Sequence, residues 1–197
     1  GFVSRSDSTL RGHYPLEPNV IAEVLEEVSG EHIDGVVIVP AFPDAGRLTI
    51  GGVHYVRGEA DTLAPVAETE FAQDATFGFP NPELAKYVEE KSAGQSAASD
   101  VIVLDLDIVR AGTDRIADAL AAARDSAPVV VDIVTENDFR ALALGLDEAE
   151  RRGMKLLYRV GPPFVRGRIG QEVRAPLTSA EAYAGSTPSP SGGLIVV

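Results

Sequence analysis

The stretch Gly35-Val36-Val37-Ile38-Val39 decides the fold of this 197-residue chain. It holds no polar side chain, and four of its five residues are β-branched. Such a continuous apolar run is typical of a strand that is covered on both faces, as in a parallel sheet. We therefore expect a parallel sheet to be built around residues 35–39.

The segments on either side of this strand alternate between strand and helix patterns. Residues 18–29 place their apolar side chains at the spacing of an amphipathic helix. Further strands are expected at 2–5, 101–106, 129–133 and 155–160, and further helices at 113–124 and 136–152. This alternation predicts an α/β fold with a mostly parallel sheet, flanked by helices and joined by right-handed crossovers.

The alternation of strands and helices is interrupted in the middle of the chain. Residues 48–56 read as a strand that leads through a turn at 57–59 into a β-hairpin insertion. Residues 61–82 are expected to be mostly loop, and 82–90 to form a short helix. A run of small residues at 93–99 reads as a linker.

Composition excludes several classes of function. Seventeen basic against 30 acidic residues give a net charge of −13, which disfavours nucleic acid as a partner. The chain has no cysteine, so disulfides and thiolate sites are excluded. No apolar run reaches the roughly 20 residues of a membrane span, and no signal-peptide pattern precedes Ser4. A cytoplasmic location without membrane contact is therefore expected.

Two polar turns follow two of the predicted strands. The first is Ser4-Arg5-Ser6-Asp7-Ser8-Thr9-Leu10-Arg11-Gly12-His13, and the second is Pro40-Ala41-Phe42-Pro43-Asp44-Ala45-Gly46-Arg47. Open α/β sheets bind ligands at the carboxyl ends of their strands, so both turns are expected to share one anion-binding cleft. In the alternative interpretation, the hydroxyls and carboxylates only cap turns and helices, and the arginines cover apolar surface.

Four motifs of the sequence, in their order and spacing, resemble those of the four-carbon acid sugar kinases. They are residues 7–12 (DSTLRG), 40–43 (PAFP) with 46–47 (GR), 51–54 (GGVH) and 68–74 (ETEFAQD). The resemblance is strong over residues 4–74. It continues more weakly toward residue 197 through 129–132 (VVVD) and 159–166 (RVGPPFVR).

This resemblance implies the sugar-binding amino-terminal domain of a two-domain, ATP-dependent kinase. Members phosphorylate the terminal hydroxyl of threonate, erythronate or 3-oxo-tetronate. The small-molecule partner is then a sugar acid, ATP and Mg²⁺ serve the intact enzyme, and a homodimer is an expected assembly. The substrate-binding residues implied are Ser6, Asp7, Ser8, Thr9, Arg11, Gly46, Arg47 and His54.

Arg11 and Arg47 are the expected ligands of the sugar carboxylate, because a guanidinium fork matches a carboxylate with two hydrogen bonds. His54 also has an alternative interpretation, because a lone histidine is more often structural or solvent-exposed than a ligand. No catalytic residue is assigned, and three scattered histidines give no metal-ligand spacing. Three carboxylates near strand ends suit either Mg²⁺ or helix capping: Asp105, Asp107 and Asp132.

The sequence departs from the family pattern in two places. The 197 residues contain neither an Asp-Asp-x-Thr-Gly motif nor a nucleotide-binding half. The expected organisation is a partial sugar-acid-binding domain at 1–184, an interdomain linker at 185–193 and the start of an absent nucleotide-binding domain at 194–197. Two rival functions remain open: a non-catalytic acid-sugar sensor and a structural α/β module.

Overall fold

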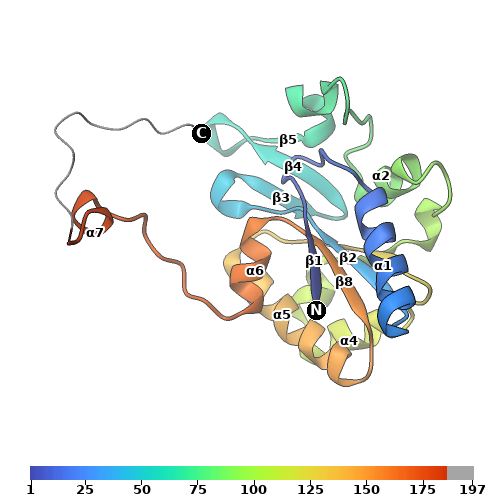
Figure 1. Cartoon of the computed structure of the whole chain (residues 1–197). Helices are drawn as coiled ribbons and strands as arrows, with labels where there is room; N and C mark the ends of the chain where they lie inside the picture. Colours follow the sequence, from blue (N-terminus) through green and yellow to red (C-terminus); the bar gives the residue numbers. More distant parts are fainter. Residues whose placement is uncertain (186–197) are drawn as a thin grey trace.

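The computed structural model describes residues 1–185, and its centre is a five-stranded parallel sheet (Figure 1). The strand order is β1-β8-β2-β7-β6. The strands are β1 (Phe2–Arg5), β2 (Gly35–Val39), β6 (Ile102–Leu104), β7 (Ala127–Val131) and β8 (Leu156–Val160). All pairings in this sheet are parallel, which confirms the predicted α/β fold.

Strand β2 lies in the middle of the sheet, and all five of its residues are buried. Successive side chains of a strand point to opposite faces, so β2 contributes to two hydrophobic clusters. Val37 and Val39 belong to the cluster that includes residues of α4, α5 and α6, whereas Val36 and Ile38 belong to the one that includes residues of α2. The helices are α1 (Leu16–Ser29), α2 (Leu84–Lys91), α3 (Leu106–Arg110), α4 (Thr113–Leu120), α5 (Glu136–Arg151), α6 (Pro162–Arg168) and α7 (Ser179–Ala182).

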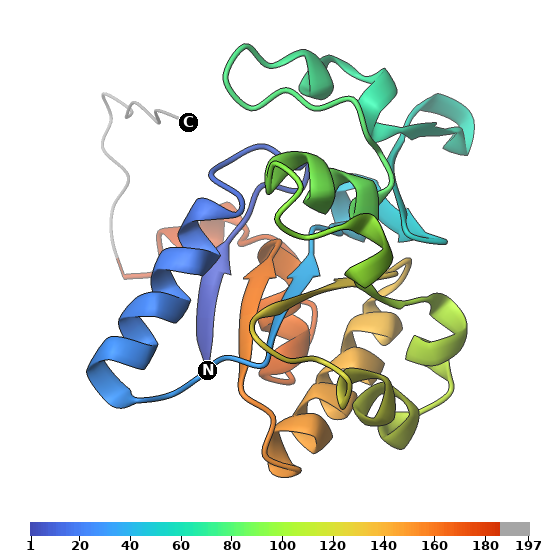
Figure 2. The ribbon, with the colours of Figure 1, turned by 90° about the vertical axis from the view of Figure 1, so that its right-hand side faces the viewer.

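A second, antiparallel sheet is inserted after β2. It consists of β3 (Arg47–Ile50), β4 (Val53–Arg57) and β5 (Leu63–Pro65). Figure 2 shows this sheet and the segments that follow it beyond the arrowheads of β1, β2 and β8, which is the carboxyl edge of the main sheet. The described residues also include five short 3₁₀ helices: Pro43–Ala45, Glu59–Asp61, Val66–Glu68, Glu70–Gln73 and Ala98–Asp100.

The prediction of one strand over 48–56 is wrong, although the predicted hairpin insertion is present. The chain turns at Gly51-Gly52, where φ is 59° and 75°. Glycine adopts this left-handed region without a steric cost, and two such residues suit a tight hairpin turn. The turn expected at 57–59 instead leads into β5, the strand that completes the small sheet.

The hairpin of β3 and β4 is fastened to the carboxyl end of β7. Thr49 and Ile133 exchange two backbone hydrogen bonds, each of 3.0 Å. The Asp132 carboxylate accepts the N–H of Gly51 at 2.6 Å and that of Gly52 at 2.9 Å. The hairpin therefore has a fixed position relative to the main sheet.

Helix boundaries differ from the sequence prediction by a few residues. Helix α1 begins at Leu16 and not at Pro18, because proline is tolerated in a first turn, where no N–H is needed. Helix α4 ends at Leu120 instead of residue 124. The unpredicted helix α3 follows β6 directly, and Asp105 caps it by accepting the N–H of Ile108 at 2.8 Å.

The chain leaves the compact domain after α6. Every residue of 169–185 is exposed, and Figure 1 shows α7 apart from the rest of the domain. The predicted linker at 185–193 and the predicted strand at 194–197 lie outside the described residues, apart from Gly185. Within the described part, no helix combines the length and apolarity that a membrane crossing requires.

Candidate anion-binding site

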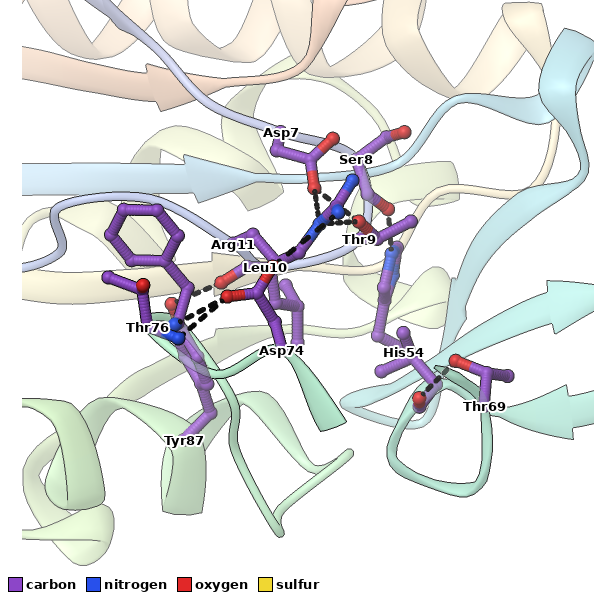
Figure 3. Close-up of polar contacts among 12 residues, drawn as sticks. Asp7, Ser8, Thr9, Leu10, Arg11, His54, Thr69, Asp74, Thr76 and Tyr87 are labelled. Carbon is purple, nitrogen blue, oxygen red and sulfur yellow. Dashed lines mark hydrogen bonds and ion pairs between the residues drawn. The ribbon is translucent and has the colours of Figure 1, made fainter. Parts of the chain in front are cut away.

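Three segments meet beyond the carboxyl ends of β1 and β2. They are residues 6–11 of the first polar turn, the second polar turn (residues 40–47) and the acidic segment (residues 68–74). Figure 3 shows Arg11 of the first turn pointing toward Asp7, Thr9 and Asp74. These contacts bring together motifs that are up to about 60 residues apart in the sequence.

Arg11 is held by its own turn. Its Nε donates to Asp7 Oδ2 at 3.0 Å and to Thr9 Oγ1 at 3.1 Å, and the Thr9 hydroxyl donates to the same Asp7 carboxylate. Nη1 lies 3.8 Å from Asp74 Oδ2, which is too long for a hydrogen bond. The Nε group therefore fixes the side chain, and the Nη groups remain available to an anion.

Arg11 and Arg47 converge on one aromatic ring. The guanidinium carbon of Arg11 lies 5.3 Å from the ring centre of Phe71, and that of Arg47 lies 5.6 Å from it. A cation at this distance from a ring is attracted by the π electrons. Two turns that the sequence analysis expected to share a cleft thus place their arginines beside the same side chain.

Two buried polar atoms at this site have no hydrogen-bond partner among the described residues: Ser6 Oγ and Arg47 Nε. They are the two such atoms that the described part of the chain contains, and both belong to residues predicted to bind substrate. Buried polar groups in folded proteins are nearly always paired.

The carboxylates of the site are stabilised in their charged form. Burial raises the pKa of Asp7, but the hydrogen bonds from Thr9 and Arg11 outweigh it and hold this pKa below its usual value. The backbone N–H groups of Phe77 and Thr76 lower the pKa of Asp74. Both groups are therefore ionised at neutral pH, and their two negative charges balance the positive charges of the two arginines.

A cavity of about 20 Å³ lies beneath the first polar turn. Its lining includes Ser6, Asp7, Arg11 and, from outside the turn, Tyr87 and Arg159. This volume suits one water molecule or one hydroxyl group. Any larger part of a ligand must lie on the open side of the turn.

Two predicted ligands are turned into the interior, and a direct contact with substrate does not fit their positions. Thr9 is 2% exposed, and its hydroxyl is engaged with Asp7 and Arg11. His54 is completely buried, and both of its ring nitrogens are hydrogen-bonded. Sequence patterns favoured ligand roles here because a polar residue in a turn looks the same whether it faces inward or outward.

The remaining predicted residues lie at the turns. Ser8 contributes its backbone carbonyl to a hydrogen bond with His54 (Figure 3). Gly46 has a φ of 75°, and a Cβ atom there would lie 3.0 Å from the Cβ of Arg57. Gly46 is therefore needed for the close approach that precedes Arg47.

The strand-end carboxylates do not fit a magnesium site. Asp105 caps α3, and Asp132 accepts two backbone N–H groups of the hairpin, so the prediction that Asp132 caps a following helix is wrong. Over residues 1–185, no group of three or more metal-ligating side chains is present.

Three residues at the site received no role in the sequence analysis: Phe71, Asp74 and Arg159. Phe71 and Asp74 lie inside the quoted motif at 68–74, and Arg159 begins the quoted motif at 159–166. Arg159 is 4% exposed, and it donates to Ser4 Oγ at 2.7 Å and pairs with Glu17. Only their place within motifs pointed to them, because contacts between distant segments leave no local pattern.

Comparison with known proteins gives a family match over most of the chain. A family model described as "Sugar-binding N-terminal domain" matches residues 1–168. D-erythronate kinase of Heliobacterium modesticaldum is 32% identical over 146 residues, which are 73% of this chain and 30% of the relative. D-threonate kinase of Salmonella typhimurium is 34% identical over 137 residues, 70% of this chain and 29% of the relative.

The chain spans about a third of the length of the curated relatives it matches. D-threonate kinase of Cupriavidus necator, for example, is 30% identical over 194 residues, 96% of this chain but 40% of the relative. Solved structures share the fold at lower identity. A Haemophilus influenzae protein aligns with a TM-score of 0.61 at 21% identity, over 85% of this chain and 37% of its own. A Bordetella bronchiseptica domain of unknown function, described as a domain-swapped dimer with bound citrate, gives 0.60 at 24%, over 85% and 35%.

Proposed function

Because the chain belongs to the family of sugar-binding N-terminal domains, we propose that its anion-binding site holds a four-carbon sugar acid for an ATP-dependent kinase. In this proposal the intact enzyme phosphorylates the terminal hydroxyl of D-threonate, D-erythronate or a close relative. The names of the relatives, two D-threonate kinases and one D-erythronate kinase, support this class of substrate.

The observation that carries the proposal is the meeting of Arg11 and Arg47 beside Phe71. Two guanidiniums lie at one place in a protein whose net charge is −13, and the charges of Asp7 and Asp74 balance theirs. In this proposal the Nη groups of Arg11 and the guanidinium of Arg47 supply donors for a carboxylate. The unpartnered hydroxyl of Ser6 supplies a partner for a sugar hydroxyl.

The contribution of this chain to the reaction is orientation. With its carboxylate held between the two arginines, a four-carbon acid presents the hydroxyl at its other end in a fixed direction. Phosphoryl transfer depends mainly on such positioning and on charge stabilisation. ATP and Mg²⁺ are proposed for the intact enzyme, outside the residues described here. The 197-residue chain alone is therefore expected to bind the sugar acid without steady turnover of ATP.

Isothermal titration calorimetry of the 197-residue chain with D-threonate and D-erythronate tests this function. We expect binding of at least one acid, and no binding of the matched polyols threitol and erythritol, which lack the carboxylate. Arg11→Lys and Arg47→Lys keep the charge but lose the planar fork. A charge-assisted hydrogen bond contributes about 1.5–3 kcal/mol, so each variant should bind roughly ten- to a hundredfold more weakly.

Arg151→Lys is the matched control, because Arg151 is 74% exposed at the far end of α5 and pairs only with Glu148 among the described residues. Its affinity should equal that of the wild type. Equal binding of acid and polyol, or lysine variants with unchanged affinity, would contradict the carboxylate clamp. A homodimer and a cytoplasmic location stay predictions.

A further inference from the structure

His54 connects the hairpin to the first polar turn. Its Nδ1 lies 2.9 Å from Thr49 Oγ1, and its Nε2 lies 2.8 Å from the carbonyl oxygen of Ser8 (Figure 3). A carbonyl oxygen can only accept, so Nε2 carries the proton and Nδ1 accepts from the Thr49 hydroxyl. The imidazole therefore joins the two segments in one fixed, neutral form.

Each end of this link lies next to an arginine of the site. Ser8 stands between Asp7 and Thr9, which are the two residues that hold the Nε of Arg11. Thr49 stands two residues after Arg47 on β3, and Thr49 itself is bonded to Ile133, which lies two residues after the end of β7 in the main sheet. The hydrogen bond between His54 and Ser8 therefore fixes the first polar turn, which carries Arg11, relative to the hairpin, which carries Arg47.

A second bond holds the first polar turn without touching the hairpin. The Tyr87 hydroxyl of α2 donates to the carbonyl oxygen of Leu10 at 2.8 Å. Leu10 has a φ of 66°, a left-handed conformation that is rare for a leucine. Tyr87 therefore supports the shape of the turn, whereas His54 fixes its distance from the hairpin.

We propose that His54 is a positioning residue that sets the separation between the guanidiniums of Arg11 and Arg47, and with it the fit of the sugar-acid carboxylate. This inference rests on the proposed function. It accounts for an uncharged, fully buried histidine one hydrogen bond away from an anion-binding turn.

Two amide variants separate the two ends of the link. The side-chain amide of His54→Gln reaches the position of Nε2 and can donate to Ser8, whereas that of His54→Asn reaches only the position of Nδ1. Measured by calorimetry on the 197-residue chain, His54→Asn should bind the sugar acid at least tenfold more weakly. His54→Gln should stay within about threefold of the wild type.

Tyr158→Phe is the matched control, since it removes the hydrogen bond of a buried tyrosine hydroxyl to Glu150 of α5, away from the first polar turn, and leaves the hairpin link in place. We expect it to lower the unfolding midpoint like His54→Asn but to keep the affinity within about threefold. If His54→Asn lowers the midpoint and leaves the affinity unchanged, His54 is only structural and the proposal is wrong. Should His54→Asn fail to fold, the ring-sized His54→Phe removes the bond to Ser8 without leaving a cavity and is expected to weaken binding in the same way.

A ligand-free measurement separates this proposal from the proposed function. The ¹⁵N–¹H signals of the Nε groups of Arg11 and Arg47 can be followed by NMR in the chain alone. They should shift in His54→Asn and remain near their wild-type positions in His54→Gln. Absence of sugar-acid binding by the wild type would overturn the proposed function, whereas unmoved arginine signals in His54→Asn would overturn the role of His54.

Discussion

Phe71 is the single side chain that both arginines of the site contact through their guanidiniums. A cation–π contact at a partly exposed position contributes about 0.5–1 kcal/mol. Because Phe71→Leu removes two such contacts, it removes about 1–2 kcal/mol of the interaction energy that holds the two guanidiniums in place. Sugar-acid affinity measured by calorimetry should fall roughly five- to thirtyfold. Phe71→Tyr keeps the ring and should bind like the wild type. Equal affinity of the leucine variant would mean that the ring only fills space.

Acidification should destabilise the fold through His54. Burial lowers the pKa of this residue to about 4, with a smaller lowering by Arg47, whereas the Ser8 carbonyl and Asp7 act in the opposite direction. The unfolded chain, with an ordinary histidine pKa of about 6.5, binds the proton first as the pH falls. Stability is therefore fully present above pH 6.5 and declines between pH 6.5 and about 4.

The size of this effect follows from about 1.4 kcal/mol per pH unit for one proton. Between pH 7 and pH 5 the wild type should lose about 2 kcal/mol more of its unfolding free energy than His54→Gln does. Urea unfolding at both pH values measures the difference. Parallel losses in the two proteins would show that His54 titrates normally in the folded state.

At the residue scale, the sequence indicated which residues lie at the site better than it indicated which of them face a ligand. Arg11 and Arg47 could be singled out because guanidiniums in polar turns at strand ends are unusual in an acidic chain. The inward orientation of Thr9 and His54 could not be predicted, since it depends on partners such as Ser8 and Asp7 in folded geometry. For the same reason, the contacts of Phe71 with the two arginines could not be predicted from the sequence.

The hairpin of β3 and β4 is the element that places Arg47, and Asp132 is its anchor. Burial raises the pKa of Asp132, although the N–H groups of Gly51 and Gly52 act against this rise. Asp132→Asn replaces one acceptor oxygen by an NH₂ group that faces a backbone donor. The loss of one such bond should cost about 1–3 kcal/mol of unfolding free energy.

Hydrogen exchange tests whether Asp132→Asn destabilises the hairpin turn itself. In that variant the amides of Gly51 and Gly52 should lose protection from exchange. Asp107→Asn serves as the control, since Asp107 is exposed on α3 and should leave both stability and exchange unchanged. Unaltered protection in Asp132→Asn would mean that backbone bonds of Thr49 hold the hairpin alone.

Helices and strands could be predicted where the local sequence pattern alone determines the structure. Strand β2 occupies the predicted residues 35–39, because a continuous β-branched run has few alternatives to a buried strand. The hairpin was misread as one strand, because Gly51-Gly52 permits both an extended chain and a turn. The contacts of Asp132 with that turn decide between the two, and they join residues about 80 positions apart.

At the scale of the whole molecule, the folded unit is expected to end near Gly170. Residues 171–185 are exposed, and the ion pair of Arg140 with Glu172 lies at the surface, where such pairs contribute little. A chain of residues 1–170 should therefore melt within about 2 °C of a chain of residues 1–185, since 1 kcal/mol corresponds to about 2–4 °C at this size. Differential scanning calorimetry of the two chains makes the comparison. A clearly lower midpoint for the shorter chain would place 171–185 within the cooperative unit.

The bonds that Asp7 and Thr9 make to Arg11 also determine when this side chain becomes ordered. Immobilising an arginine costs up to about 2 kcal/mol in lost rotamer freedom. Here the rotamer is selected as the chain folds, before any anion arrives, so the guanidinium is preorganised. A ligand that reaches the site meets a donor already in place, and its capture is limited by encounter instead of by a search among side-chain conformations.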